Sequence, residues 1–359
     1  MTRGIGRVGI LTGGGDCPGL NAVIRAVTKS LIHHGRCEVI GIQDGFEGLM
    51  AETPLVQPLD WERVSGILHI GGTMLGTSNS ANPLRDAATL ARVAHNVRAL
   101  ALDVVVAIGG DGTMSLAHGV AQATGIHCVG VPKTIDNDIA HCERSFGFDT
   151  AVTTATEAIR RVESTASSHH RVMIVETMGR HSGWLALESG LAGAADVILL
   201  PEIDYDVQAV AAHCRAREAR QRYTIICIGE GAKARGGALT VREHVAGSPD
   251  PVRLGGVGHV LRVQLQSLLS SEVRATVLGH VQRGGDPTPF DRVLATRFGH
   301  HAAELVLARR FGEMVTLSGA RISSVPIARV ANVQRLVTLD HELVTMARDI
   351  GVCLGDAPA

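Results

Sequence analysis

The sequence predicts an α/β protein built from parallel sheets that are covered on both faces by helices. Short apolar runs rich in Val and Ile recur along the chain, and segments with helical periodicity lie between them. Such runs are typical of strands buried on both faces, and their alternation with helices indicates βα units. We expect strands at Val8–Thr12, Glu38–Ile42, Val104–Ile108, Cys128–Val131, Val172–Glu176, Val197–Leu200, Thr224–Gly229 and Ala275–Leu278.

Helical periodicity is clear in the segment Asp149–Ala166. Its apolar residues Val152, Ala155, Ile159 and Val162 follow one another at steps of three and four, which places them on one face of a helix. This is the pattern of a helix that covers a sheet.

The composition argues against a general role on nucleic acid or on a membrane surface. The chain has 359 residues and is 45% hydrophobic, which is enough for the core of one or two domains. Its 34 Lys and Arg nearly balance its 35 Asp and Glu, and only ten residues are aromatic. No apolar run approaches the ~20 residues that span a bilayer, and the first residues lack the apolar core of a signal peptide. Seven Cys occur without a CxxC pair, so we expect reduced thiols in a cytoplasmic protein.

The segment Pro132–Asp138 carries two carboxylates directly after the apolar run Cys128–Val131. In an open α/β sheet, ligands bind beyond the carboxyl ends of the strands. A carboxylate there can take a proton from a substrate hydroxyl, and its neighbour can help to organise a metal or phosphates. The alternative is an Asx-rich turn that only caps a helix.

Two further strands run into Gly-rich turns. Val104–Ile108 leads into Gly109–Thr113, and Val8–Thr12 leads into Gly13–Asp16. Small residues let backbone N–H groups approach phosphate oxygens, and Asp111 is then placed to hold a Mg²⁺ that bridges phosphates. One such turn is weak evidence, because tight turns need Gly for backbone reasons alone. The turns fit neither the P-loop pattern nor the dinucleotide pattern G-x-G-x-x-G.

Four motifs together resemble the 6-phosphofructokinase family, in its ATP-dependent branch or its mixed-substrate bacterial group. They are GGDGT at 109–113, PKTIDND at 132–138, MGRHSGW at 178–184 and GHVQRGGDPTPFDR at 279–292. NAD kinases and lipid kinases also carry GGDGT, but PKTIDND followed by MGRHSGW separates the two cases. The resemblance implies two Rossmann-like lobes: residues 1–147 with 282–332 for the nucleotide, and 148–281 with 333–359 for the sugar phosphate.

The resemblance also implies the catalytic roles. Asp136 is similar to the catalytic base, and Thr134 to the residue that contacts the phosphate in flight. Asp138 supports the metal and Asp136, Arg180 faces the transferred group, and Asp111 binds Mg²⁺. The simpler alternatives are a helix cap for Asp138 and a surface Arg at a strand end for Arg180.

The remaining site residues follow from the same motifs. The resemblance assigns ATP to Gly14, Gly15, Gly110, Asp111, Gly112 and Thr113. It assigns fructose 6-phosphate to Thr134, Ile135, Asp136, Arg171, Met178, Gly179, Arg180, Glu230, Arg274, His280, Val281, Gln282 and Arg283. Arginines suit the 6-phosphate because they bind phosphate in a bidentate way. In the family, Arg171 and Arg274 come from a neighbouring subunit, so we expect at least a dimer and favour a tetramer. A solvated charge is the alternative for Glu230, and a core-edge histidine is the alternative for His280.

The phosphoryl donor depends on two residues with opposite indications. In the family, Gly after the GGD aspartate leaves room for the ATP α-phosphate, whereas pyrophosphate users tend to carry Asp, so Gly112 favours ATP. Lys133 favours pyrophosphate, but steric exclusion should outweigh one cation, and we expect ATP. Asn79 stands where many relatives place a phosphate-binding Arg, for which Arg85 is a candidate substitute. The family's effector site is matched only at Glu202.

The expected function is therefore an ATP-dependent 6-phosphofructokinase. It would use Mg²⁺ to move phosphate from ATP to the 1-hydroxyl of fructose 6-phosphate, with no nucleic-acid or membrane partner. Two alternatives stay open: a pyrophosphate-dependent or relaxed-acceptor sugar-phosphate kinase, and a catalytically silent regulatory paralogue.

Overall fold

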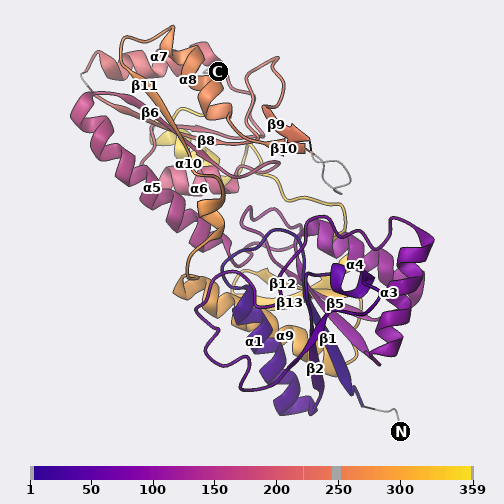
Figure 1. Cartoon of the computed structure of the whole chain (residues 1–359). Helices are drawn as coiled ribbons and strands as arrows, with labels where there is room; N and C mark the ends of the chain where they lie inside the picture. Colours follow the sequence, from indigo (N-terminus) through magenta and orange to yellow (C-terminus); the bar gives the residue numbers. More distant parts are fainter. Residues whose placement is uncertain (1–3, 221, 245–251, 357–359) are drawn as a thin grey trace.

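The computed structural model describes residues 4–220, 222–244 and 252–356 and contains two layered α/β lobes, seen one above the other in Figure 1. The first lobe holds a seven-stranded sheet in the order β13-β12-β5-β4-β1-β2-β3. Its strands are β1 (Arg7–Thr12), β2 (Glu38–Ile42), β3 (Val56–Leu59), β4 (Val104–Gly109), β5 (Cys128–Pro132), β12 (Glu313–Ser318) and β13 (Arg321–Pro326).

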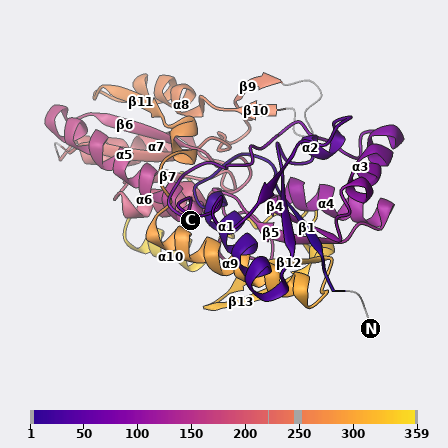
Figure 2. The ribbon, with the colours of Figure 1, turned by 60° about the horizontal axis from the view of Figure 1, so that its bottom comes forward.

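Helices cover both faces of this sheet. α1 and α9 pack against each other on one face, and α3 and α4 lie on the other, as Figures 1 and 2 both show. The helices of this lobe are α1 (Leu20–Ser30) with its π-helical end η1 (Leu31–Gly35), α2 (Glu47–Met50), α3 (Ala87–Ala99), α4 (Asp111–Thr124), α9 (Pro289–Leu307) and the short η3 (Ile327–Arg329).

The second lobe holds a smaller parallel sheet in the order β11-β6-β8-β7. Its strands are β6 (Val172–Thr177), β7 (Val197–Leu199), β8 (Thr224–Gly229) and β11 (Val273–Val277), with a separate hairpin of β9 (Val241–His244) and β10 (Val252–Leu254). α5 and α6 lie on one face, and α7 and α8 on the other (Figure 1). Its helices are α5 (Phe148–His169), α6 (Trp184–Ala192), α7 (Val207–Glu218), α8 (Val257–Gln266), η2 (Gly279–Arg283) and α10 (Glu342–Asp349).

The eight predicted strands are all present in sheets that are mainly parallel, and two strands that were not predicted pair antiparallel at the edges of the first sheet. β3 pairs antiparallel with β2, and β13 pairs antiparallel with β12. These edge strands are short or half-exposed, so they lack the continuous apolar run that identifies a central strand. The predicted helix over 149–166 is confirmed as α5. The bounds of the two lobes stay a prediction. β12 and β13 belong to the first sheet, and α10 packs against α6.

A buried carboxylate joins the starts of α5 and α9. Asp291 accepts hydrogen bonds from the Thr150 amide (2.8 Å) and the Thr150 hydroxyl (2.6 Å). Thr288, the N-cap of α9, donates to Asp149 over 2.7 Å. Burial raises the pKa of Asp291 to about 6. The end of the motif that began at 279 therefore fastens the helix of one lobe to the helix of the other.

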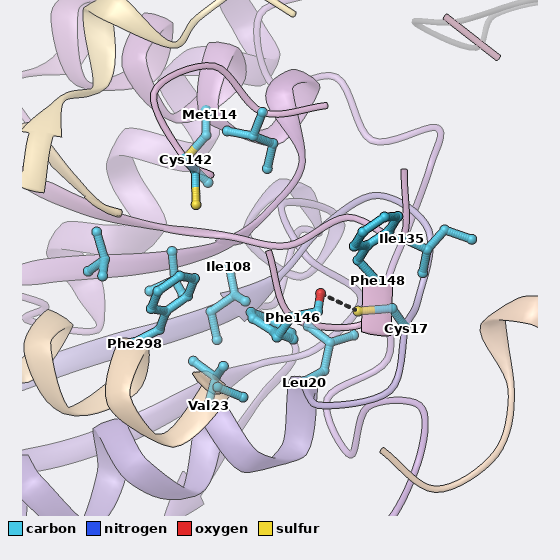
Figure 3. Close-up of a cluster of buried hydrophobic side chains, with 14 of the residues drawn as sticks. Cys17, Leu20, Val23, Ile108, Met114, Ile135, Cys142, Phe146, Phe148 and Phe298 are labelled. Atoms are coloured by element: carbon cyan, nitrogen blue, oxygen red, sulfur yellow. Dashed lines mark hydrogen bonds between the residues drawn. The ribbon is translucent and has the colours of Figure 1, made fainter. Parts of the chain in front are cut away.

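The core below the first Gly-rich turn is apolar and closely packed (Figure 3). Phe146, Phe148 and Phe298 are fully buried there, and the Cys17 thiol donates to the Phe146 carbonyl over 3.8 Å. Burial raises the pKa of Cys17 to about 12, so it stays a thiol. All seven cysteines are free, which agrees with the expected reduced thiols. No helix in the described ranges is long and apolar enough to cross a bilayer.

Substituting Asp291→Ala should lower the free energy of unfolding by about 2 kcal/mol, because two buried donors of Thr150 lose their acceptor. Asp291→Asn should cost less, since the amide oxygen still accepts one of these bonds. Scanning calorimetry measures both, with the exposed Asp349→Ala as the control. Equal melting temperatures for wild type and Asp291→Ala would contradict the assignment.

Candidate active site

The carboxyl ends of three neighbouring strands bring the two Gly-rich turns together. The Gly13 amide, after β1, donates to Ile108 of β4 over 2.9 Å, and the Lys133 amide, after β5, donates to the Gly109 carbonyl over 2.9 Å. A side chain at Gly13 would start 2.7 Å from the Thr113 hydroxyl, so only Gly fits this approach. The predicted nucleotide residues therefore lie at one edge of the first sheet.

The second turn ends at the start of α4. Gly110 is the N-cap, Asp111 begins the first turn, and no side chain caps its amides. Free amides at the positive end of a helix dipole favour phosphate. Gly112 is exposed, and a Cβ there would meet nothing within 4 Å. This open space is the feature on which the donor argument depends.

Two cations flank Gly15 of the first turn. The ammonium of Lys133 is buried and donates to the Gly15 carbonyl, and burial lowers its pKa. From the other side, Arg283 donates from Nη1 to the Asp16 carbonyl over 3.0 Å. A Cβ on Gly15 would lie 2.6 Å from Nη1 of Arg283, so a larger residue there would displace the guanidinium. Both cations lie where phosphate oxygens would be neutralised.

The two carboxylates of PKTIDND occupy different environments. Asn137 between them has a left-handed backbone, with φ of 53°. The Thr134 hydroxyl donates to Asp138 over 3.0 Å and accepts from the Asp136 amide over 3.0 Å. Oδ1 of Asp136, in contrast, is buried without a hydrogen-bond partner in the described part of the chain. The alternative of a helix cap for Asp138 is wrong, because the next helix, α5, has Gly147 as its N-cap.

Burial and mutual repulsion shift this acidic cluster toward neutral pKa values. The pKa of Asp138 is raised to about 7, first by burial and then by the charges of Asp136 and Asp111. Burial also raises the pKa of Asp136, while Arg283 and Lys133 oppose the shift. Carboxylates tuned in this way are typical of acid–base sites.

The strands of the second sheet lead to two further charged residues, Arg180 and Glu230. Arg180 follows β6, and Glu230 follows β8, where its amide donates to Thr177 over 2.9 Å. Arg180 is partly buried, and burial lowers its pKa against the charge of Glu230. Burial, then Asp136, raises the pKa of Glu230 to about 7. Neither Arg180 nor Glu230 is therefore a fully solvated charge, and both lie in the electrostatic field of Asp136.

Comparison with known proteins agrees with this arrangement. Residues 7–306 match the family described as phosphofructokinase. The chain belongs to the phosphofructokinase family. The match covers all four motifs, the whole of the second sheet and five strands of the first, β1 to β5, so the resemblance seen in the sequence is confirmed.

Individual relatives in the family differ in the donor that their names give. The chain is 45% identical to an ATP-dependent 6-phosphofructokinase 2 of Clostridium perfringens, over 99% of this chain and 100% of the relative. It is 47% identical to a pyrophosphate–fructose 6-phosphate 1-phosphotransferase of Streptomyces coelicolor, over 97% and 100%. An ATP-dependent 6-phosphofructokinase of Chloroflexus aggregans is 46% identical, over 98% of both chains. Names that give ATP are the majority among relatives of this similarity, which favours ATP as the donor.

Solved structures of the family confirm the fold. The phosphofructokinase of Pichia pastoris superposes with a TM-score of 0.79 at 30% identity. The alignment covers 92% of this chain but only 36% of that one, so the chain spans about a third of its length.

Two predicted phosphofructokinase residues lie away from the cluster. Arg171 precedes β6 and Arg274 lies on β11, and both pair with Glu272, Arg171 over 2.5 Å. Both residues lie near the start of their strands, β6 and β11. The other ends of these strands lead to Met178 and Leu278, and six residues of strand span about 20 Å. Within one chain they do not join Arg180. Their predicted part in a neighbouring subunit's site stays a prediction.

Other predicted sugar contacts differ in what they can offer a ligand. Ile135 is only 1% exposed and packs into the core, which leaves its backbone alone for binding. Gln282 is buried, accepts from the Met178 amide over 3.3 Å and donates to Gly279 over 3.0 Å, so it orders this loop. His280 and Val281 are exposed. Their roles toward substrate stay predictions.

The residues present fit a Mg²⁺ that is carried by phosphates rather than by a protein cage. In the described ranges no group of three or more His, Cys, Asp or Glu is placed to hold a metal. Asp111 offers one carboxylate beside free helix amides, and Mg²⁺ commonly binds through one or two carboxylates plus substrate phosphates.

Sequence analysis missed Ser182, which contacts the turn that carries Asp136. Ser182 donates from its hydroxyl to the Asp136 carbonyl over 3.0 Å, and it stands inside the motif MGRHSGW, which was the available signal.

Glu202 accepts from the amides of Gly183 (2.9 Å) and Val337 (2.8 Å), so here it ties loops together. Arg85 is engaged with Asp86 and Thr89 at the start of α3, each over 3.0 Å.

The raised pKa of Asp136 predicts an acid limb at a higher pH than an exposed aspartate would give. As pH falls, the proposed base takes up a proton and can no longer accept one from the hydroxyl, so activity should fall. Asp138→Asn removes one negative charge beside Asp136 and should shift the limb down by about one pH unit. Initial rates with both substrates far below KM report the free enzyme. A wild-type limb near pH 4, or an unshifted limb in the variant, would count against this picture.

Proposed function

We propose that this chain is an ATP-dependent 6-phosphofructokinase. It moves the γ-phosphoryl group of ATP to the 1-hydroxyl of D-fructose 6-phosphate and releases fructose 1,6-bisphosphate and ADP. The observation that carries the proposal is the buried Oδ1 of Asp136, which has no hydrogen-bond partner among the described residues and lies in the electrostatic field of Arg180, Lys133 and Arg283. A hydroxyl that donates to this oxygen would satisfy it and present its own oxygen to the phosphate.

The roles follow from the chemistry of phosphoryl transfer, which needs alignment and charge neutralisation more than covalent steps. Asp136 accepts the proton of the 1-hydroxyl. Arg180, Lys133 and Arg283 offset negative charge on the phosphates. Bound Mg²⁺ would supply further neutralisation from a position beside Asp111. The amides at the start of α4 hold the donor phosphates.

ATP is favoured as the donor by the open space at Gly112. A carboxylate at this position would project from the first turn of α4 and repel the outer phosphates of a nucleotide; Gly places neither charge nor bulk there. Lys133, the feature shared with pyrophosphate users, is already bound to the Gly15 carbonyl, so its charge is partly committed to holding the loop.

The proposal extends to the setting of the enzyme. It would act in glycolysis, in the cytoplasm, with Mg²⁺ as cofactor. Arg171 and Arg274 lie too far from Arg180 to bind the same sugar phosphate within one chain. A homo-oligomer, at least a dimer and by the family pattern a tetramer, would supply them to the 6-phosphate of a neighbour.

The base assignment is tested with Asp136→Asn. Wild type should convert fructose 6-phosphate and Mg-ATP to equal amounts of fructose 1,6-bisphosphate and ADP. The variant should lose about 10²-fold or more in kcat with KM changed only a few-fold, because the amide binds but accepts no proton. Asp349→Asn, exposed and remote, is the control. No product from the wild type would refute the function, and full turnover by the variant would refute the role of Asp136.

The donor assignment is tested with Gly112→Asp and its neutral partner Gly112→Ala. The aspartate should lower kcat/KM for ATP by about 10-fold or more through repulsion and loss of space. The alanine should keep most ATP activity, because a Cβ at 112 meets nothing within 4 Å. Activity is measured with ATP and with pyrophosphate at equal Mg²⁺. A wild type that works only with pyrophosphate would overturn the donor while leaving the kinase reaction intact.

A further inference from the structure

The segment 332–337, here called the C-terminal strap, lies across the catalytic loops. At one end the Asn332 amide donates to the Ser115 hydroxyl of α4 over 3.1 Å. At the other end the Val337 amide donates to Glu202 of the second lobe over 2.8 Å. The strap therefore reaches from the phosphate-binding helix to the opposite lobe.

Arg335 makes the contacts at the middle of the strap. Its amide donates to the Asp138 carbonyl over 2.7 Å, and its Nη1 donates to the Asn137 carbonyl over 3.2 Å. The guanidinium lies over the indole of Trp184, 4.0 Å from the ring centroid. Trp184 in turn donates from Nε1 to the Arg335 carbonyl over 3.0 Å. Two carbonyls of the catalytic turn are thus held by one residue whose own position is fixed by Trp184.

These carbonyls belong to the turn that sets the direction of both carboxylates. Asn137 has a left-handed backbone, which costs a residue with a Cβ about 1 kcal/mol or more and persists only where surrounding contacts hold it. Arg335 holds the peptides on the carboxyl side of Asp136, while Ser182 holds the Asp136 carbonyl over 3.0 Å. Releasing one of these holds would let the carboxylate of Asp136 rotate away from the hydroxyl.

We propose that Arg335 is a positioning residue, which keeps the Asp136 carboxylate aligned through the carbonyls of Asn137 and Asp138. The inference rests on the proposed function, because it concerns the base of that reaction. Gln334 adds a further contact between the strap and the site, since its Nε2 lies 3.4 Å from Oδ2 of Asp111. One strap thus contacts the turns that carry both the base and the metal-binding aspartate.

Arg335→Ala should lower kcat by about 10- to 100-fold while KM for both substrates stays within about threefold, because a misaligned base slows chemistry without weakening binding. Arg335→Lys should recover part of the loss, since an ammonium can donate to Asn137 but cannot lie flat on the indole. Arg329→Ala, exposed on η3, is the matched control and should leave both parameters unchanged.

A double-mutant cycle with Asp136→Asn separates positioning from general stability. If Arg335 acts through the Asp136 carboxylate, adding Arg335→Ala to Asp136→Asn should change kcat by less than about twofold, measured by end-point product formation. A full additional 10-fold loss on that background would overturn the proposal. So would a kcat for Arg335→Ala within twofold of wild type.

Trp184→Phe covers the case in which Arg335→Ala does not fold. It keeps an aromatic face below the guanidinium and removes only the donor to the Arg335 carbonyl, so kcat should fall severalfold with KM unchanged. An unchanged kcat in both Trp184→Phe and Arg335→Lys would reject the proposal. These failures are distinct from failure of the proposed function, which would appear as a wild-type protein that forms no product.

Discussion

The burial of several carboxylates at the end of β5 is the constraint on which the site depends. Asp136 and Asp138 lie two residues apart, burial raises the pKa of both, and the charge of Asp136 raises that of Asp138 further. Such a cluster persists because Lys133 and Arg283 lie beside it and because the Thr134 hydroxyl pairs with one carboxylate. The Gly-rich turns contribute by leaving room for these cations at the edge of the sheet.

The central architecture could be predicted because buried parallel strands leave a continuous apolar run. β6, β7 and β8 of the second sheet and β1, β2, β4 and β5 of the first have that pattern. β3 and β13 do not, because an edge strand is paired on one side only and need not carry a continuous apolar run. The order of strands, and the return of α9 to the first lobe, depend on contacts far apart in sequence that no local pattern encodes.

The site was predictable where its residues stand inside motifs and unpredictable where they do not. Asp111, Asp136 and Arg180 follow strands whose carboxyl ends converge, so sequence position alone brings them near one another. Arg335 stands in a segment without a motif, and its contacts to Asn137 and Asp138 arise from the path of the chain after β13. The packing of Ile135 into the core was equally hidden, because an apolar residue in a polar motif can face either way.

The division of the site between two sheets explains why so many contacts bridge the lobes. The proposed base, Asp136, lies on the first lobe and Arg180 on the second, and phosphoryl transfer tolerates little error in the distance between such groups. Asp291 fastens the starts of α5 and α9, Ser182 reaches the Asp136 carbonyl, and Trp184 holds Arg335. The first two bonds join a residue beside the first sheet to one beside the second, and the third ties the strap to the second lobe. Under the proposed function neither sheet alone could keep this alignment, because both would supply reacting groups.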